Sequence, residues 1–220
     1  MTASHVIVIA LISVGAIFVY ALGNMDVSIG KQVGLYATLM VYFGNKTGSL
    51  LPGIVISLII AIMIAIINGG AGQVLHIIPI VPSLVFMFIL SGISTVIYTK
   101  LGSRNISLSS IDYSVFKNPV LMLVILVVEV VIVNYFFYYT KYGKYAKAIG
   151  ANSVAAEQSG INLLKYKVIC YVIMSVCVVL GAIFQMGYTD STSDSIVLFP
   201  TIMVILYAKM RKKSIVFFYD

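Results

Sequence analysis

Most of this chain falls into apolar blocks close in length to a membrane-spanning helix. Segments rich in glycine, asparagine and charge separate seven blocks, the last of them weaker: residues 5–22, 27–43, 51–67, 79–97, 119–139, 168–186 and 196–208. A helix needs about 20 mostly apolar residues to cross a hydrocarbon core about 30 Å thick. The pattern therefore predicts an all-α, polytopic membrane protein with about six to seven transmembrane helices, forming a single domain over residues 1–220.

The composition excludes an ordinary soluble enzyme. Hydrophobic residues make up 61% of the chain and charged residues 10%, whereas a soluble domain is about half apolar and about a quarter charged. The formal net charge of +7 does not indicate nucleic-acid binding, because Lys and Arg gather at block ends, where they orient membrane helices. The first block lacks a preceding basic stretch and a small-residue cleavage site, which favours a retained helix over a signal peptide.

The distribution of basic residues predicts which side of the membrane is cytoplasmic. If the loop 140–167 is cytoplasmic, the alternation of spans places residues 209–213 on the same side. That side then carries nine basic residues: Lys141, Lys144, Lys147, Lys165, Lys167, Lys209, Arg211, Lys212 and Lys213. The other side keeps four: Lys46, Lys100, Arg104 and Lys117. Cytoplasmic loops near the spans collect Lys and Arg. This orientation is therefore favoured, with Tyr135, Tyr138 and Tyr139 as an aromatic belt at the cytoplasmic end of the fifth helix.

A polar interruption separates the first two blocks. The stretch from Gly23 to Gly30 contains Asp26 and Ser28 and is too short for an ordinary loop. It predicts a broken or sharply turned helix, in which Asp26 or Ser28 accepts hydrogen bonds from free backbone N–H groups and Gly30 permits close helix approach. A site beside a transport pathway and a purely structural cap are equally compatible with this pattern.

A second acid, Glu129, lies in the middle of the fifth block. Charged groups within a span are costly, about 2.5 to 3.5 kcal/mol on insertion scales, and are often functional. A pathway role for Glu129 competes with an inter-helix hydrogen bond or a protonated buried acid. Cys170 and Cys177 lack partners at ligand spacing and are interpreted as small hydrophobic residues. The sequence offers no catalytic, phosphate-binding or metal-binding motif, so we predict no catalytic residues, no metal and no cofactor.

The loop 140–167 carries the clearest functional pattern. Asn152 precedes a short polar segment that ends at Gly160, which predicts a capped helix stopped by glycine. Ala155, Ala156 and Ser159 give this helix a small-residue face that a partner protein can approach closely. The alternative is an amphipathic helix resting on the membrane, although its apolar face is small for that purpose.

Two motifs resemble a known family. The segment from Ala148 to Ile161, AIGANSVAAEQSGI, resembles the cytoplasmic coupling loop of permease subunits of bacterial ABC importers, in the branch that carries ribose, other simple sugars and autoinducer-2. The stretch from Asn24 to Gly30, NMDVSIG, is similar to a motif that follows an early helix in that branch. The two motifs occur in the right order, and Asn68-Gly69-Gly70 also resembles the family's middle region.

The resemblance implies a partner set. Two permease subunits, identical or different, enclose a path through the membrane. An extracytoplasmic solute-binding protein delivers the sugar to this path. Two cytoplasmic ATP-binding subunits dock on the coupling loops. Such permeases bind no nucleotide and work in the bacterial inner or plasma membrane in contact with lipid. Matched to the motifs, the ATPase-coupling residues are Gly150, Asn152, Ala155, Ala156, Ser159 and Gly160. The residues near the path are Asp26, Ser28 and Gly30.

The chain also departs from the family. Ala151 replaces a usual glycine, and Glu157 stands where a basic residue is common. The start and the end both lack elements that the family normally has, which predicts a truncated chain. An ATP-independent secondary transporter or channel, a non-transporting permease fragment, and a permease for branched-chain amino acids remain the alternatives.

Overall fold

The computed structural model describes residues 3–100, 105–107, 114–189 and 191–193, and helices account for most of this part of the chain. Its helices are α1 (Ala3–Ala21), α2 (Ile29–Thr47), α3 (Leu51–Val74), α4 (Ile80–Lys100), α5 (Pro119–Tyr139), α6 (Lys141–Ala151), α7 (Ser153–Gln158) and α8 (Leu163–Thr189), with a 3-10 turn, η1 (Ser114–Lys117). Two three-residue strands, β1 (Asn105–Ser107) and β2 (Ser191–Ser193), pair antiparallel. The predicted all-α membrane fold is confirmed.

Each of the first six predicted spans corresponds to a helix, and the fifth has the predicted bounds. The seventh, residues 196–208, lies outside the described residues. Within the described part, α3, α4, α5 and α8 are long and apolar enough to cross a membrane, whereas the apolar stretch of α1, Val6–Ala21, is shorter. The structure therefore contains four clear spans and two further helices that pack with them.

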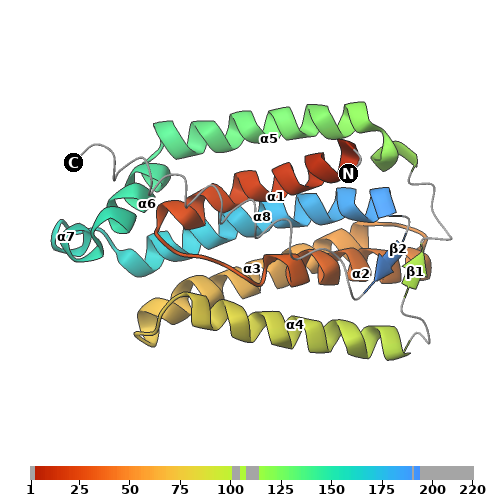
Figure 1. The fold of residues 1–220 in the computed structure, drawn as a ribbon, viewed down its shortest axis with the longest axis horizontal. Helices are drawn as coiled ribbons and strands as arrows, with labels where there is room; N and C mark the ends of the chain where they lie inside the picture. Colours follow the sequence, from red (N-terminus) through yellow and green to blue (C-terminus); the bar gives the residue numbers. More distant parts are fainter. Residues whose placement is uncertain (1–2, 101–104, 108–113, 190, 194–220) are drawn as a thin grey trace.

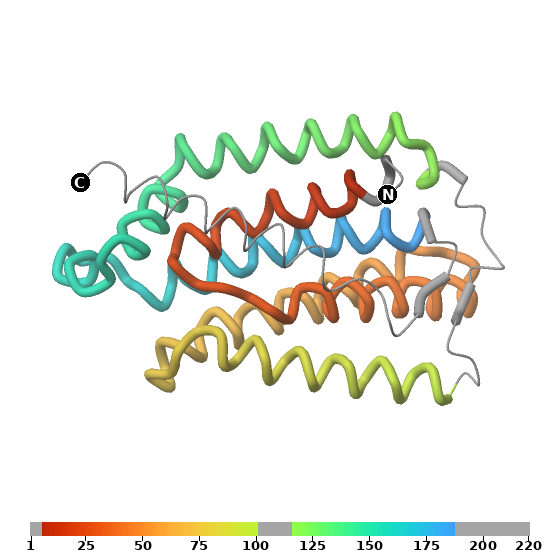
Figure 2. The backbone as a smooth tube through the Cα atoms, viewed as in Figure 1, coloured from red at the N-terminus to blue at the C-terminus, as the bar shows by residue number. Residues whose placement is uncertain are grey.

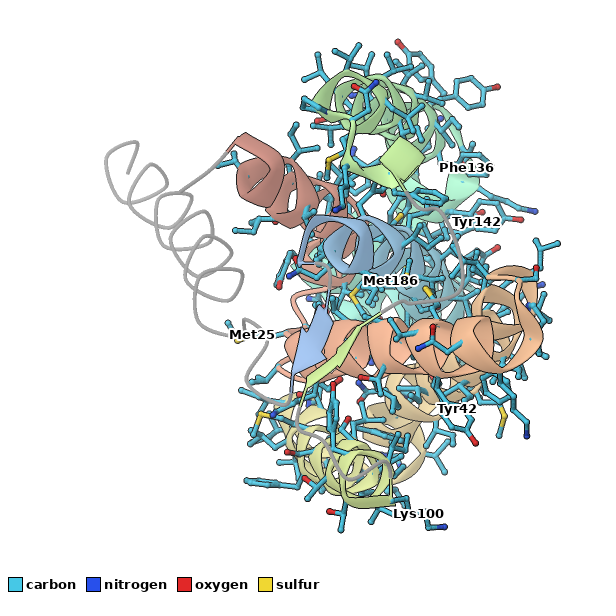
Figure 3. All side chains as sticks on the ribbon, turned by 90° about the vertical axis from the view of Figure 1, so that its right-hand side faces the viewer. Met25, Tyr42, Lys100, Phe136, Tyr142 and Met186 are labelled. Carbon is cyan, nitrogen blue, oxygen red and sulfur yellow. The ribbon has the colours of Figure 1, made fainter. Side chains whose placement is uncertain are left out.

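Helix α8 lies at the centre of the bundle and α5 at its edge (Figures 1 and 3). Helix α8 packs against α1, α2 and α3, while α5 is held mainly by α1 and α6. In the most apolar stretch of each helix, 61% of the α8 residues are buried within the chain, against 17% of the α5 residues. Apolar side chains on the outer faces of α3, α4 and α5 are exposed, as expected for helices that face lipid or another subunit.

The two ends of the bundle differ. The short helices α6 and α7 lie at one end, and β1 and β2 lie at the other (Figure 1). The lysines of α6 are at the end predicted to be cytoplasmic, while Lys46 and Lys100 lie in the last turns of α2 and α4 at the opposite end. The predicted cap of the fifth helix is confirmed, because Asn118 accepts a hydrogen bond from Val120 N at 2.9 Å.

Candidate functional site: a polar break and a coupling segment

The chain between α1 and α2 turns back into the bundle before α2 begins (Figure 2). At this break, Oδ1 of Asp26 accepts hydrogen bonds from Ser28 N at 2.8 Å and Ser28 Oγ at 2.6 Å. Asp26 is 2% exposed. Its carboxylate lies beside the N-terminal end of α2, where backbone N–H groups lack helical partners and the helix dipole favours negative charge. The predicted break is confirmed, with Asp26 as the acceptor.

The break also joins α2 to two other helices, through Asp26 and Val27. Its second oxygen, Oδ2, accepts a hydrogen bond from Asn68 Nδ2 of α3 at 2.9 Å. The adjacent Val27 N donates to Ser83 Oγ near the start of α4 at 3.3 Å. Both Asn68 and Ser83 are buried. The break is therefore a junction at which side chains from α3 and α4 satisfy polar groups of the segment before α2.

A row of polar side chains extends from the break along one face of α2. Ser28 Oγ accepts a hydrogen bond from Gln32 Nε2 at 2.7 Å, and Gln32 Oε1 accepts one from Tyr36 OH at 3.2 Å. All three residues are at most 1% exposed. Sequence reasoning identified Ser28 but not Gln32 or Tyr36, although the i, i+4, i+8 spacing of polar residues in an apolar block is a readable signal. Gly30 is buried in the first turn of α2.

Glu129 is the second buried acid, and it lies on α5, outside the hydrogen-bond network of Asp26. It points inward from α5 and is 6% exposed. The thiol of Cys177 on α8 lies against its carboxylate, and Gly15 of α1 packs on the same cysteine. In the described part of the chain, neither carboxylate oxygen has a hydrogen-bond partner by distance and angle.

The capped helix predicted in the loop 140–167 is confirmed as α7. Asn152 Oδ1 accepts a hydrogen bond from Ala155 N at 3.1 Å, and Gly160 ends the segment with φ +81°, a conformation that strains residues with a Cβ. Asn152, Ala155 and Ser159 are exposed, whereas Ala156 is 5% exposed and packs inward. Of the three residues of the predicted small-residue face, Ala155 and Ser159 are therefore accessible and Ala156 is not.

Gly150 belongs to α6 and lies against the end of α1. A Cβ at this position would overlap the carbonyl oxygen of Ala21, so only glycine permits this approach. Ala21 is the last residue of α1, and the polar break that contains Asp26 follows directly. Gly150 thus brings α6 against the residues that lead into the break, a contact that its sequence motif did not indicate.

Together, the apolar bundle, its internal polar break and the projecting α6–α7 segment define a multi-pass membrane protein. Among the described residues, no group of three or more His, Cys, Asp or Glu side chains is arranged to hold a metal ion. The family described as the permease component of the branched-chain amino acid transport system matches residues 1–210, and the chain belongs to this family.

The chain is also similar to bacterial sugar permeases. Galactose/methyl galactoside import permease proteins of Salmonella typhimurium and Escherichia coli align with 26% and 27% identity over 217 residues, 89% of this chain and 64% of each relative. A galactofuranose transporter permease protein of Escherichia coli aligns with 24% identity over 181 residues, 80% of this chain and 52% of that protein. The chain thus spans about half to two thirds of the length of these relatives. No solved structure matches it.

These relationships confirm the predicted kinship with permeases of sugar-type importers. Together with the apolar spanning helices, they place the chain in the bacterial inner or plasma membrane as a multi-pass protein.

Proposed function

We propose that this chain is the transmembrane permease subunit of an ATP-driven importer that carries a sugar or a similar small solute. The observation that carries the proposal is the match of residues 1–210 to a permease family, combined with relatives that are sugar import permeases. The family description names branched-chain amino acids, so these are the competing substrate class. A sugar is favoured because the named relatives carry galactose, methyl galactoside or galactofuranose.

In the proposed assembly, cytoplasmic ATP-binding subunits dock on α7 and hydrolyse ATP, while this chain forms the path with a second permease subunit. An extracytoplasmic solute-binding protein delivers the solute to the opposite side. The small, exposed side chains of Ala155 and Ser159 support the docking role, because α7 projects from the bundle and these two positions allow close approach of a partner. The chain itself then needs no cofactor and no catalytic group.

The contact between Gly150 and Ala21 supports a route for coupling. A displacement of α6 acts directly on the last turn of α1 and hence on the segment that leads to Asp26. We assign Asp26, Ser28 and Gly30 to the rigid core beside the path. Glu129, whose carboxylate has no oxygen or nitrogen donor among the described residues, is the acid available to contact a solute or the path.

Co-purification with an ATP-binding subunit of a bacterial sugar importer tests the docking role. Ala155→Arg adds a long, charged side chain at an exposed position of α7 and leaves the buried Ala156 in place. We expect this variant to lose most of the ATPase that the unmodified chain captures. Thr47→Arg introduces the same group at an exposed position at the other end of the bundle and should capture ATPase normally.

Absence of capture by the unmodified chain would contradict the importer proposal and favour an ATP-independent transporter or a non-transporting fragment. Uptake in a strain that lacks its own full-length sugar permease separates the remaining cases. Restored galactose uptake supports the sugar assignment, restored leucine uptake supports the amino-acid alternative, and capture of ATPase without any uptake indicates a docking-competent fragment.

A further inference from the structure

A cavity of about 340 Å³ lies where α6 crosses the ends of α1 and α5. Its lining residues are Tyr20, Ala21, Gly23, Phe137, Tyr138, Lys147 and Gly150. The volume falls within the range of pockets that hold small ligands. The cavity includes neither the exposed Ala155 and Ser159 nor the Asp26 network. Gly150 and Ala21, whose contact is proposed above as a coupling route, form one of its walls, but no role proposed above uses Lys147 or the space itself.

Lys147 is the cation of this cavity. Its Nζ lies 4.4 Å from the ring centroid of Phe137 and 4.3 Å from that of Tyr138. These rings hold the ammonium by cation–π attraction, but they leave its hydrogen-bond capacity open, because an ammonium has three donors. Within the described part of the chain, no carboxylate forms a salt bridge or hydrogen bond with Lys147. Tyr20 and Tyr138 add two phenol groups to the lining.

The surrounding charge favours an anion. Residues 140–167 contain five lysines, and Glu157 is their single acidic residue. Lys141 and Lys144 lie on the exposed side of α6 together with Lys147. The carbonyl ends of α1 and α5 attract a cation and account for part of the position of Lys147, but they do not account for the excess of lysines over acidic residues in the loop 140–167.

The position in the membrane favours a lipid as the source of that anion. The cavity lies beside the last turn of α5, where Tyr135, Tyr138 and Tyr139 are exposed and form the predicted aromatic belt at head-group level. Basic pockets between helices on the cytoplasmic side are typical sites for anionic head groups. We propose that this cavity binds the phosphate group of an anionic phospholipid, with Lys147 as the contacting cation.

Thermal unfolding of the purified full chain in non-ionic detergent tests the site. Cys170 and Cys177 are free and buried, so a thiol-reactive dye reports their exposure on unfolding. A ligand that binds only the folded state raises the unfolding midpoint. We expect phosphatidylglycerol to raise the midpoint and phosphatidylcholine to raise it much less. Lys147→Gln should lose at least about half of the phosphatidylglycerol effect.

Lys144→Gln is the matched control, because it removes the same charge from the same helix at a residue that does not line the cavity. It should keep most of the phosphatidylglycerol effect. If Lys147→Gln gives no cooperative transition, Lys147→Met replaces it, since methionine keeps an apolar stem over the two rings without the charge.

Three outcomes would overturn the proposal. Equal losses in the Lys147 and Lys144 variants would show diffuse attraction to the lysine-rich surface. An equal effect of phosphatidylcholine would show that the acyl chains, not the charge, are recognised. A Lys147-dependent rise of the same size with inorganic phosphate would show that the cavity takes a free anion instead of a lipid.

Discussion

Asp26 and Glu129 are both carboxylates buried within the helix bundle, but only one of them is surrounded by hydrogen-bond donors. Asp26 accepts three hydrogen bonds, two from Ser28 and one from Asn68. Glu129 has the Cys177 thiol beside it, and no donor meets the distance and angle requirements at either oxygen among the described residues. The two acids are comparably buried, at 2% and 6% exposure.

The difference follows from where each acid lies along its helix. Asp26 is at a break, where the backbone N–H groups that begin α2 have no helical carbonyl partner and are available to a carboxylate. Glu129 is inside a continuous helix, where backbone donors are used by the helix itself, so only side chains of neighbouring helices can reach it. The neighbour there is Cys177, against which Gly15 packs, and a thiol is a weak donor. Asp26 is therefore fixed by hydrogen bonds to the surrounding fold, whereas Glu129 is not.

The largest expected effect is that of Asp26→Ala. The substitution leaves Ser28 N, Ser28 Oγ and Asn68 Nδ2 buried without their acceptor, and each unsatisfied buried group costs about 1 to 3 kcal/mol. We expect the free energy of unfolding to fall by about 3 kcal/mol or more. The dye assay with Cys170 and Cys177 measures this as a lower midpoint. Asp26→Asn keeps one carbonyl oxygen as acceptor and should lose clearly less of the free energy of unfolding than Asp26→Ala. Equal losses in the two variants would contradict the role of the carboxylate oxygens as acceptors.

Sequence reasoning found Asp26 because its signal is local. A charged residue between two apolar blocks is visible in the chain itself, and the caps formed by Asn118 and Asn152 follow equally local rules. Asn68 is 42 residues away from Asp26, and its hydrogen bond depends on how α3 packs. The sequence showed the acid at the break but not the donor that α3 contributes.

A smaller loss of the free energy of unfolding is expected for Asn68→Leu. The substitution removes one of the three donors to Asp26 and leaves Oδ2 of Asp26 without its partner. A buried polar atom left unsatisfied costs about 1 to 3 kcal/mol, whereas an inter-helix hydrogen bond in a membrane contributes about 0.6 kcal/mol on average and about 1.7 kcal/mol at most. The Oδ1 atom of Asn68 has no partner among the described residues, so its removal offsets part of the cost. Asn134→Leu, the same change at an exposed position of α5, should leave the midpoint nearly unchanged. A loss for Asn68→Leu as large as that of Asp26→Ala would show that Asn68 carries the junction.

The loop 140–167 shows a second limit of prediction from sequence. The polar loop 140–167 was correctly predicted to contain a capped helix, yet α6 and the inward packing of Ala156 were not predicted. Small residues at consecutive positions do not reveal which of them faces the protein, because that depends on the angle at which α6 and α7 meet. The overlap that any side chain at Gly150 would make with α1 is likewise a property of packing.

The smallest effect on stability, and the sharpest test of the comparison, is expected for Glu129→Leu. An apolar side chain of similar size removes a buried carboxyl that has no strong donor, and replacing such a group is often neutral or stabilising. We expect the unfolding midpoint to stay level or rise, with a free-energy change of at most about 1 kcal/mol. Solute uptake by an importer containing this variant should fall if Glu129 contacts the path as proposed. A large loss of stability would instead show that the Cys177 thiol is a sufficient partner, and normal uptake with normal stability would remove Glu129 from the path.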